Sequence, residues 1–542
     1  MVKKINKHWP IFCAIGIYWG VITLLTIMIY REHGFLIYPL DDTYIHMAIA
    51  KNVALYNTWG ISRFGFSSST SSPLWTLLLS IVYRIAGVND LAPLGLNLLF
   101  GTLTLWITYY FLNAFVRNLV WIFLVLCIAI FVTPLPTITM VGMEHTLQIF
   151  LTLCYVYLTL GLLVTGDKVS RMGYATLLLL ALLISMARYE CLFLVFVVSV
   201  LLLLQRKIIL AIVQGGCGLI LVVLYGIWSV SQGWYFIPNS LILKGNVQAF
   251  SVKSIIKMIS GYNALWRMDN NPHILLLMVL VSFFLLTWVI KERGFDKKKF
   301  LSLIFIGTTG LHMQFAQTGW FYRYEAYIVL LGILIVGIGI NQLLLEGGKW
   351  KFEKAYLPRY LAGAALVFVI AVPFGFRARN SLIEIPIAAQ DRYHEHIQIE
   401  HFIKKYYSDS VVVVNDLGAV AYFTDAKVLD MFGLGNIEPV AYRYQTGDYT
   451  SQDVYDWTKG AKIAILQVEW GEIAPRIPSE WKRIGTWELP GNIVWGDVNN
   501  KIGFYAIENT EINRLSQNLK AFSVALPEDV KLIYDGISGH QS

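Results

Sequence analysis

The run PIFCAIGIYWGVITLLTIMIY (10–30) and the segment DDTYIHMAIAKNV (41–53) that follows it decide how this chain is interpreted. An apolar run of about 20 residues is long enough to cross a bilayer as a helix. The basic segment MVKKINKHW precedes the run and no small-residue cleavage site ends it, which predicts an uncleaved first membrane helix. The adjacent acids Asp41 and Asp42 would then lie just outside the membrane.

The composition of the whole chain is that of a membrane protein. Of its 542 residues 56% are hydrophobic and 14% are charged, whereas soluble domains have about 25% charged residues. From residue 381 onward there are 14 Lys and Arg against 22 Asp and Glu, and the remainder has 29 against 13. Nucleic-acid binding requires basic residues clustered on a folded face, so the acidic tail argues against it. The five cysteines lie in apolar runs without CxxC spacing, which argues against disulfides and cysteine metal sites.

Long apolar runs predict about eleven membrane-spanning helices. Loops rich in Lys and Arg face the cytoplasm, and all six basic connectors do so if the short run 73–87 lies at the outer interface or re-enters from it. The loop 31–90 and the tail then lie outside the cytoplasmic (inner) membrane. The runs are 10–30, 91–114, 118–134, 146–164, 173–187, 190–204, 208–230, 273–290, 300–317, 325–344 and 357–376.

The tail has the patterns of a soluble α/β domain. The segment HEHIQIEHFIKKYY (394–407) suits an amphipathic helix. The segments VVVVN (411–415), KIAILQV (462–468) and KIGFYAIE (501–508) suit strands. We therefore predict a transmembrane catalytic module over 1–380 and an extracytoplasmic α/β domain over 381–542.

The pair Asp41 and Asp42 is the first candidate for chemistry. Transfer of a sugar to a hydroxyl requires a base that removes the proton as the anomeric carbon is attacked. One carboxylate can serve as that base while its neighbour orients the acceptor or holds a cation. The alternative is a helix cap, because Asp is a common N-cap and Thr43 begins a helical stretch.

Ionisable residues between apolar helices form the second group. Such residues are costly in a membrane and are usually functional or paired. Guanidinium groups bind phosphate through two hydrogen bonds, so we expect Arg188 and Arg323 to bind a lipid phosphate. The alternative for Arg188 is an ion pair with Glu190 that joins two helix ends. Lys244 and Asn239 are further phosphate-binding candidates, and Glu144, Glu190, Tyr322, Glu325 and Trp320 are supporting ones.

Several motifs occur in an order that resembles the GT-C membrane glycosyltransferases. The resemblance is strongest to the branch that contains the terminal arabinofuranosyltransferases of mycobacterial cell walls. Two departures are Tyr189, where the family has proline, and a serine-rich segment in place of a GYTN signature. The matching segments are DDTYIHMAIAKN (41–52), SSTSSPLWTLL (68–78), GMEHTL (142–147), RYE (188–190), PNSLILK (238–244), TGWFYRYEAYIVLL (318–331) and DLGAVAYFTDAKVLDMFGLGN (416–436).

The resemblance implies a polyprenyl-phosphate-linked sugar, hexose or pentose, as donor and a cell-envelope glycan or glycolipid as acceptor. It implies Asp41 as general base and Asp42 as its helper. Some members use a divalent cation at this site, for which Asp42 would supply an oxygen ligand. It also suggests that residues of the tail contact the acceptor glycan, although turn and core roles are the alternative. These residues are Asp416, Tyr422, Asp430 and Asn436.

Two other functions remain open from the sequence. A transferase that uses a diphosphate-linked oligosaccharide would share the topology but relies on Arg and His centres. The external histidines near the acids are His46 and His145, which we interpret as interface residues. A lipid-linked sugar flippase would place its charges along a pathway at mid-membrane, whereas here they gather at one face.

Overall fold

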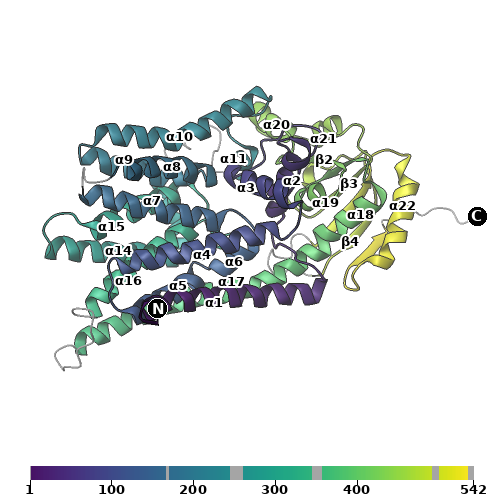
Figure 1. Ribbon diagram of the computed structural model, residues 1–542. Helices are drawn as coiled ribbons and strands as arrows, with labels where there is room; N and C mark the ends of the chain where they lie inside the picture. Colours follow the sequence, from purple (N-terminus) through teal and green to yellow (C-terminus); the bar gives the residue numbers. More distant parts are fainter. Residues whose placement is uncertain (1, 166–169, 245–259, 345–356, 491–499, 535–542) are drawn as a thin grey trace, which may run out of the picture.

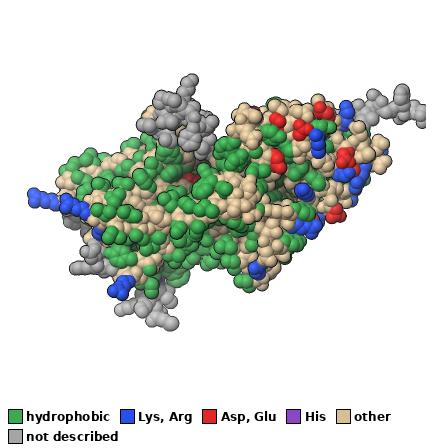
Figure 2. Space-filling view, turned by 90° about the horizontal axis from the view of Figure 1, so that it is seen from above, with side chains coloured by type: hydrophobic (Ala, Val, Ile, Leu, Met, Phe, Trp, Pro, Cys, Tyr) green, Lys and Arg blue, Asp and Glu red, His purple; other side chains and the backbone are tan. Residues whose placement is uncertain are grey.

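The computed structural model describes residues 2–165, 170–244, 260–344, 357–490 and 500–534. Long helices lie side by side in one part, and a sheet with short helices lies at one end of them (Figure 1). Hydrophobic side chains cover most of the helical part, and acidic and basic side chains gather over the sheet domain (Figure 2). The predicted polytopic helical membrane protein with a C-terminal α/β domain is therefore confirmed.

The helical part follows the apolar runs of the sequence. Seven of the described helical stretches are long and apolar enough to cross a membrane, and all eleven predicted spans fall on helices. The helices are α1 (Val2–His33), α2 (Asp41–Tyr56), α3 (Pro73–Ala86), α4 (Ala92–Asn113), α5 (Leu119–Val132), α6 (Leu135–Val141), α7 (His145–Thr165), α8 (Arg171–Ala187), α9 (Cys191–Leu204), α10 (Ile208–Ser231), α11 (Asn239–Lys244), α13 (Tyr262–Asn270), α14 (Pro272–Lys291), α15 (Lys297–Phe315), α16 (Ala326–Leu344) and α17 (Leu357–Arg392).

Helix α3 corresponds to the run for which we predicted an interfacial or re-entrant position. It begins where Ser72 accepts a hydrogen bond from the Trp75 amide, with Pro73 in the first turn. One face is buried against α2, and Leu77, Ile81 and Ile85 are exposed at a spacing of four residues. An apolar stripe on a short helix of this kind suits a position in the membrane interface.

Helix α17 connects the helical part to the sheet domain. It continues past residue 380, the predicted division, to Arg392, and then passes through one π-helical turn, η3 (Tyr393–Ile397), into α18 (Gln398–Tyr406). In Figure 1 it runs as one long rod between the two parts. Side chains on this helix can therefore contact both parts of the molecule.

The C-terminal domain is built on one mixed six-stranded sheet of order β2-β1-β3-β5-β4-β6. Strand β1 is parallel to β2 and β3, and the remaining neighbours pair antiparallel. The predicted strands correspond to β1, β3 and β5. The elements are β1 (Val411–Val414), α19 (Gly418–Phe423), β2 (Lys427–Asp430), α20 (Glu438–Thr446), α21 (Ser451–Trp457), β3 (Ile463–Gln467), η4 (Ala474–Arg476), β4 (Lys482–Glu488), β5 (Lys501–Ala506), α22 (Glu511–Phe522), η6 (Ser523–Ala525) and β6 (Lys531–Tyr534).

The parallel part of the sheet faces the helical part with its carboxyl edge. Asp416 follows β1, Gln467 ends β3 and Asp430 ends β2. Polar residues at the carboxyl ends of parallel strands meet at one edge, where open α/β sheets bind their ligands. This edge lies against α2, which makes its most extensive contact with the sheet domain through α19.

Candidate active site

The two adjacent acids begin helix α2. The residue before them, Leu40, occupies the N-cap position, and no side chain caps the helix. Asp41 and Asp42 therefore do not act as caps, although their negative charge suits the first turn of a helix. Both acids line one cavity of ≈ 900 Å³ between the helical part and the C-terminal domain.

The C-terminal domain holds the carboxylate of Asp41. Its Oδ2 accepts the Gly418 N–H at 2.6 Å, and its Oδ1 accepts the Ala419 N–H at 2.9 Å. A Cβ atom at position 418 would lie 2.2 Å from the backbone oxygen of Asp41, so only glycine permits this approach. The close contact with Asp41, at the start of α2, therefore explains why position 418 in the segment DLGAVAYF is a glycine.

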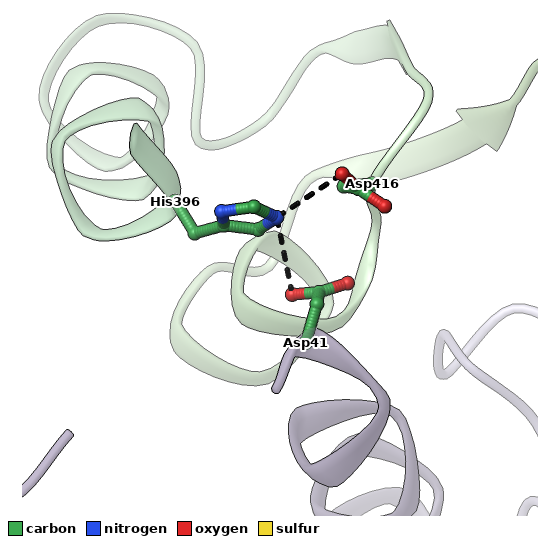
Figure 3. A group of neighbouring side chains, drawn as sticks. All are labelled: Asp41, His396 and Asp416. Carbon is green, nitrogen blue, oxygen red and sulfur yellow. Dashed lines mark ion pairs between the residues drawn. The ribbon is translucent and has the colours of Figure 1, made fainter. Parts of the chain in front are cut away.

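His396 lies between carboxylates that come from three elements. Figure 3 shows its ring pointing toward Asp41 and Asp416. Its Nε2 is 3.3 Å from Asp416 Oδ2 and 4.0 Å from Asp41 Oδ1, and its Nδ1 is 3.4 Å from Glu395 Oε2. The Gln467 amide donates to Asp416 at 3.3 Å and also to Glu395.

This cluster shifts the pKa values of its members. Burial and Arg392 lower the pKa of His396, but the surrounding carboxylates outweigh them and raise it to about 10. The imidazolium holds the pKa of Asp416 below its ordinary value although burial opposes it. Burial raises the pKa of Asp41, and His396 offsets this only in part. An aspartate with a raised pKa is a stronger base than an ordinary one.

The other acid, Asp42, is paired with an arginine from a distant part of the chain. Arg323 donates from Nη2 to Asp42 Oδ2 at 2.7 Å and to the Tyr324 hydroxyl at 3.0 Å. Arg188 also contacts Tyr324: its guanidinium carbon lies over the ring, 5.4 Å from the ring centre. The structure therefore brings together α2, Arg188 at the end of α8 and the 318–325 segment.

Arg188 is bound to two carboxylates. It donates to Glu190 at 3.0 Å and 2.5 Å and to Glu144 at 2.9 Å. This is the ion pair between helix ends that we named as the alternative. Arg188 and Arg323 are both buried and do not line the cavity, so their direct contact with a phosphate stays a prediction.

The segment 318–325 forms a strained turn beside the cavity. Trp320, Phe321 and Tyr322 have φ values of 49°, 61° and 58°, a region that costs non-glycine residues about 1–3 kcal/mol each. Buried Glu325 holds the turn: it accepts the Gly319 N–H and an Arg377 N–H, both at 2.8 Å. The turn presents Trp320 and Tyr322 to the cavity, where Trp320 is half exposed.

The remaining phosphate candidates are Asn239 and Lys244, at the two ends of α11. The Asn239 side chain donates to the backbone oxygens of Gly433 at 2.8 Å and Asn436 at 3.2 Å, which joins α11 to the C-terminal domain. Lys244 is the last residue of α11, and its side chain lies outside the described part of the structure. Binding of phosphate by either residue stays a prediction.

The tail residues proposed to contact the acceptor have different surroundings. Asp416 lines the cavity, whereas Tyr422 donates to Asp90 at 2.7 Å in the contact between the two parts. Asp430 accepts the amides of Phe432, Leu434 and Gly435 and thus shapes the loop that carries Phe432 and Leu434 to the cavity. Asn436 accepts the Asp430 N–H at 2.7 Å. Asp430 and Asn436 therefore stabilise a turn, which is the role that the sequence analysis gave as the alternative to acceptor binding.

Sequence reasoning missed several residues of the site. The run His394-Glu395-His396 was available as a signal, but we interpreted it only as part of an amphipathic helix. The other missed residues can be recognised as part of the site only in the folded protein, where distant elements come together at the cavity wall. The missed residues that line the cavity include Gln317, Arg379, Asn380, Ile383, Glu384, Arg392, Glu395, Phe432, Gln467 and Trp470.

Comparison with solved structures shows which fold this is. ArnT from Cupriavidus metallidurans bound to undecaprenyl phosphate matches with a TM-score of 0.55 and 9% identity, over 93% of this chain and 99% of that chain. The apo form of the same enzyme gives 0.53 and 12%, over 92% and 99%. The chain has the GT-C fold. The apo oligosaccharyltransferase of Archaeoglobus fulgidus gives a TM-score of 0.49 and 10% identity, over 96% and 79%.

Sequence comparison adds one match, in the C-terminal domain. Residues 385–507 match a family described as a domain of unknown function, DUF8728. Those residues include His396, Asp416 and Gln467. The comparison with curated proteins gives no match.

The donor set of the cluster fits a divalent cation. One ligand atom each of Asp41, His396 and Asp416 lies within 4.8 Å of the others. Carboxylate oxygens with one imidazole nitrogen suit Mn²⁺ or Zn²⁺. Asp42, the ligand suggested by the sequence, is outside this group because it pairs with Arg323.

Proposed function

We propose that this protein is a membrane glycosyltransferase that moves a single sugar from a polyprenyl-phosphate carrier to a cell-envelope glycan or glycolipid. The observation that carries the proposal is the cavity into which both acids face, in a chain whose fold matches ArnT bound to undecaprenyl phosphate. The membrane is the cytoplasmic one, and the cavity and C-terminal domain lie on its outer side. The motif resemblance favours the arabinofuranosyltransferases, and donors with pentose or hexose both fit.

The transfer is a direct displacement with inversion at the anomeric carbon. The acceptor hydroxyl gives its proton to Asp41 as its oxygen bonds to that carbon, and the bond from the carbon to the phosphate oxygen breaks. Each oxygen of Asp41 accepts one amide hydrogen bond and retains a second lone pair for the acceptor. The polyprenyl phosphate leaves with the electron pair of that bond. Cationic side chains that bind the phosphate stabilise the negative charge that develops on it.

The acceptor enters from the side of the C-terminal domain. The ring of Phe432 stacks on Trp470 with centroids 5.2 Å apart, and both line the cavity. Such aromatic faces suit the apolar faces of sugar rings, and Asp416 supplies a hydrogen-bond acceptor beside them. The domain therefore completes the site in addition to covering it.

A divalent cation would bind through Asp41, His396 and Asp416. It would supply positive charge beside the acceptor oxygen and would lower the pKa of a bound hydroxyl. Binding requires His396 to give up its proton, which ties cation affinity to pH.

The test uses the purified full chain in lipid nanodiscs. It is incubated with a panel of undecaprenyl-phosphate-linked pentoses and hexoses and with envelope glycans from a strain that lacks the protein. Mass spectrometry measures undecaprenyl phosphate release and mass gain on the acceptor. We expect Asp41→Asn and Asp42→Asn to lower turnover by about 100-fold or more, the contribution of a positioned base.

Asp456→Asn is the matched control, because Asp456 is an exposed aspartate whose partners in the described part of the chain, Lys459 and Gln452, lie in or next to its own helix α21. Binding of undecaprenyl phosphate to each variant separates loss of catalysis from loss of folding. Normal turnover in both acid variants would exclude the assigned chemistry. Activity only with a diphosphate-linked oligosaccharide would favour the oligosaccharide transferase, and lipid scrambling that survives loss of both acids would favour a flippase.

A further inference from the structure

The cavity carries more negative than positive charge. Its described lining contains five carboxylates and two guanidinium groups, Arg379 and Arg392. A phosphate that enters such a cavity requires a cation whose charge is not already neutralised. The carboxylates are Asp41, Asp42, Glu384, Glu395 and Asp416.

The other arginines near the acids are committed to partners. Arg392 forms an ion pair with Glu395, at 3.5 Å. Arg188 and Arg323 are buried in ion pairs behind the cavity wall. Neither lines the cavity, so each could reach a phosphate there only by moving; for Arg188 this would leave Glu144 buried without its charge partner, which costs several kcal/mol.

Arg379 differs from all three. Its side chain is exposed, and its contact is a long hydrogen bond of 3.5 Å to the neighbouring Asn380. Among the residues that the structure describes, no carboxylate lies within ion-pair distance of it. At least four of its five N–H donors are therefore available to a ligand.

An apolar stripe on α17 leads to Arg379. The exposed large apolar residues of α17 lie at positions 361, 367, 368, 369, 372, 376 and 383. Positions 367 and 369 flank the face that contains the others, and 18 residues separate 361 from 379, which is five helical turns. Arg379 therefore lies on the same face as Leu361, Phe368, Val372 and Phe376. Ile383, one turn further along, already lines the cavity.

We propose that Arg379 binds the phosphate of the polyprenyl-phosphate donor while the carrier chain lies on the stripe Phe368–Val372–Phe376. This inference rests on the proposed function and names the part of the protein that holds the donor. A lipid with one anionic head and a long apolar chain matches a helix face that is apolar along its length and cationic where it enters the cavity.

The test measures binding of undecaprenyl phosphate to the full chain in phosphatidylcholine nanodiscs by native mass spectrometry. Arg379→Ala should weaken binding by roughly 10- to 100-fold, because hydrogen bonds to charged groups contribute that much. Arg379→Lys should lose less, since the charge remains but the paired donors do not. Undecaprenol, which lacks the phosphate, should bind equally to wild type and Arg379→Ala.

Arg31→Ala is the matched control: Arg31 is an exposed arginine in the last turn of a membrane-spanning helix, away from the cavity lining. It should bind undecaprenyl phosphate as wild type does. Equal binding by wild type and Arg379→Ala would overturn the inference and leave the proposed function standing. Failure of the wild type to bind undecaprenyl phosphate would overturn both.

Discussion

Replacing Glu325 by glutamine tests how the strained turn beside the cavity is held. Glu325 is fully buried, and its two oxygens accept N–H groups of Gly319 and Arg377, both at 2.8 Å. Arg377 also donates to the Tyr322 backbone oxygen at 3.2 Å. The pair therefore holds both ends of the segment whose residues have positive φ.

The expected cost follows from the burial of the pair. Removing one partner of a buried ion pair costs about 3–5 kcal/mol, because the remaining charge loses its compensation. Glutamine keeps an oxygen for the Gly319 amide, so we expect the lower end of that range. The strain at Trp320, Phe321 and Tyr322 adds to the tendency of the turn to open.

Hydrogen exchange followed by mass spectrometry measures this opening in the full chain. A change of about 3 kcal/mol in opening free energy corresponds to roughly 100-fold faster exchange in segment 318–326. Glu384→Gln is the control, because Glu384 accepts an uncharged hydroxyl from the same turn, Tyr322, at 3.0 Å. Its glutamine variant should change exchange by less than about tenfold.

A double variant tests whether Glu325 and Arg377 act as a pair. Removal of both charges in Glu325→Gln with Arg377→Met should accelerate exchange by less than the product of the two single effects, since neither charge remains buried alone. Unchanged exchange in Glu325→Gln would refute the role of the pair. Purely multiplicative effects in the double variant would show that the two residues act independently.

Two further predictions concern the C-terminal domain. Burial outweighs the backbone hydrogen bonds to Asp430 and raises its pKa to about 7. A raised carboxyl pKa gives stability below the unfolded value of about 4 that is lost as pH rises through the folded value. Exchange in segment 430–436, corrected for its intrinsic pH dependence, should therefore accelerate between about pH 4 and pH 7 in the wild type but not in Asp430→Asn. Full-chain titration with Mn²⁺ should show binding that Asp416→Asn weakens by about tenfold or more, whereas Asp42→Asn leaves it unchanged. A loss in Asp42→Asn with none in Asp416→Asn would place the cation at Asp42 instead.

The sequence alone predicted the apolar helices, three of the six strands of the tail (β1, β3 and β5) and Asp41 and Asp42 as candidates for chemistry. Apolar runs and alternating patterns can be recognised locally, because the periodicity of a single helix or strand decides which of its residues face the same side. Motif order also identified Glu144, Arg188 and Arg323, which lie in one buried network. Each of these residues stands out because a charge between apolar segments is costly.

Only the tertiary structure decided what each charge does. His396 and Asp41 are 355 positions apart in the sequence, whereas Arg377 and Arg379 lie two positions apart in the segment FRARN (376–380). One arginine of α17 is buried on Glu325 and the other faces the cavity, since residues two apart on a helix point to different sides. These charged groups come within contact distance of one another only when α2, α17 and the edge of the sheet pack together. No local sequence pattern contains that information.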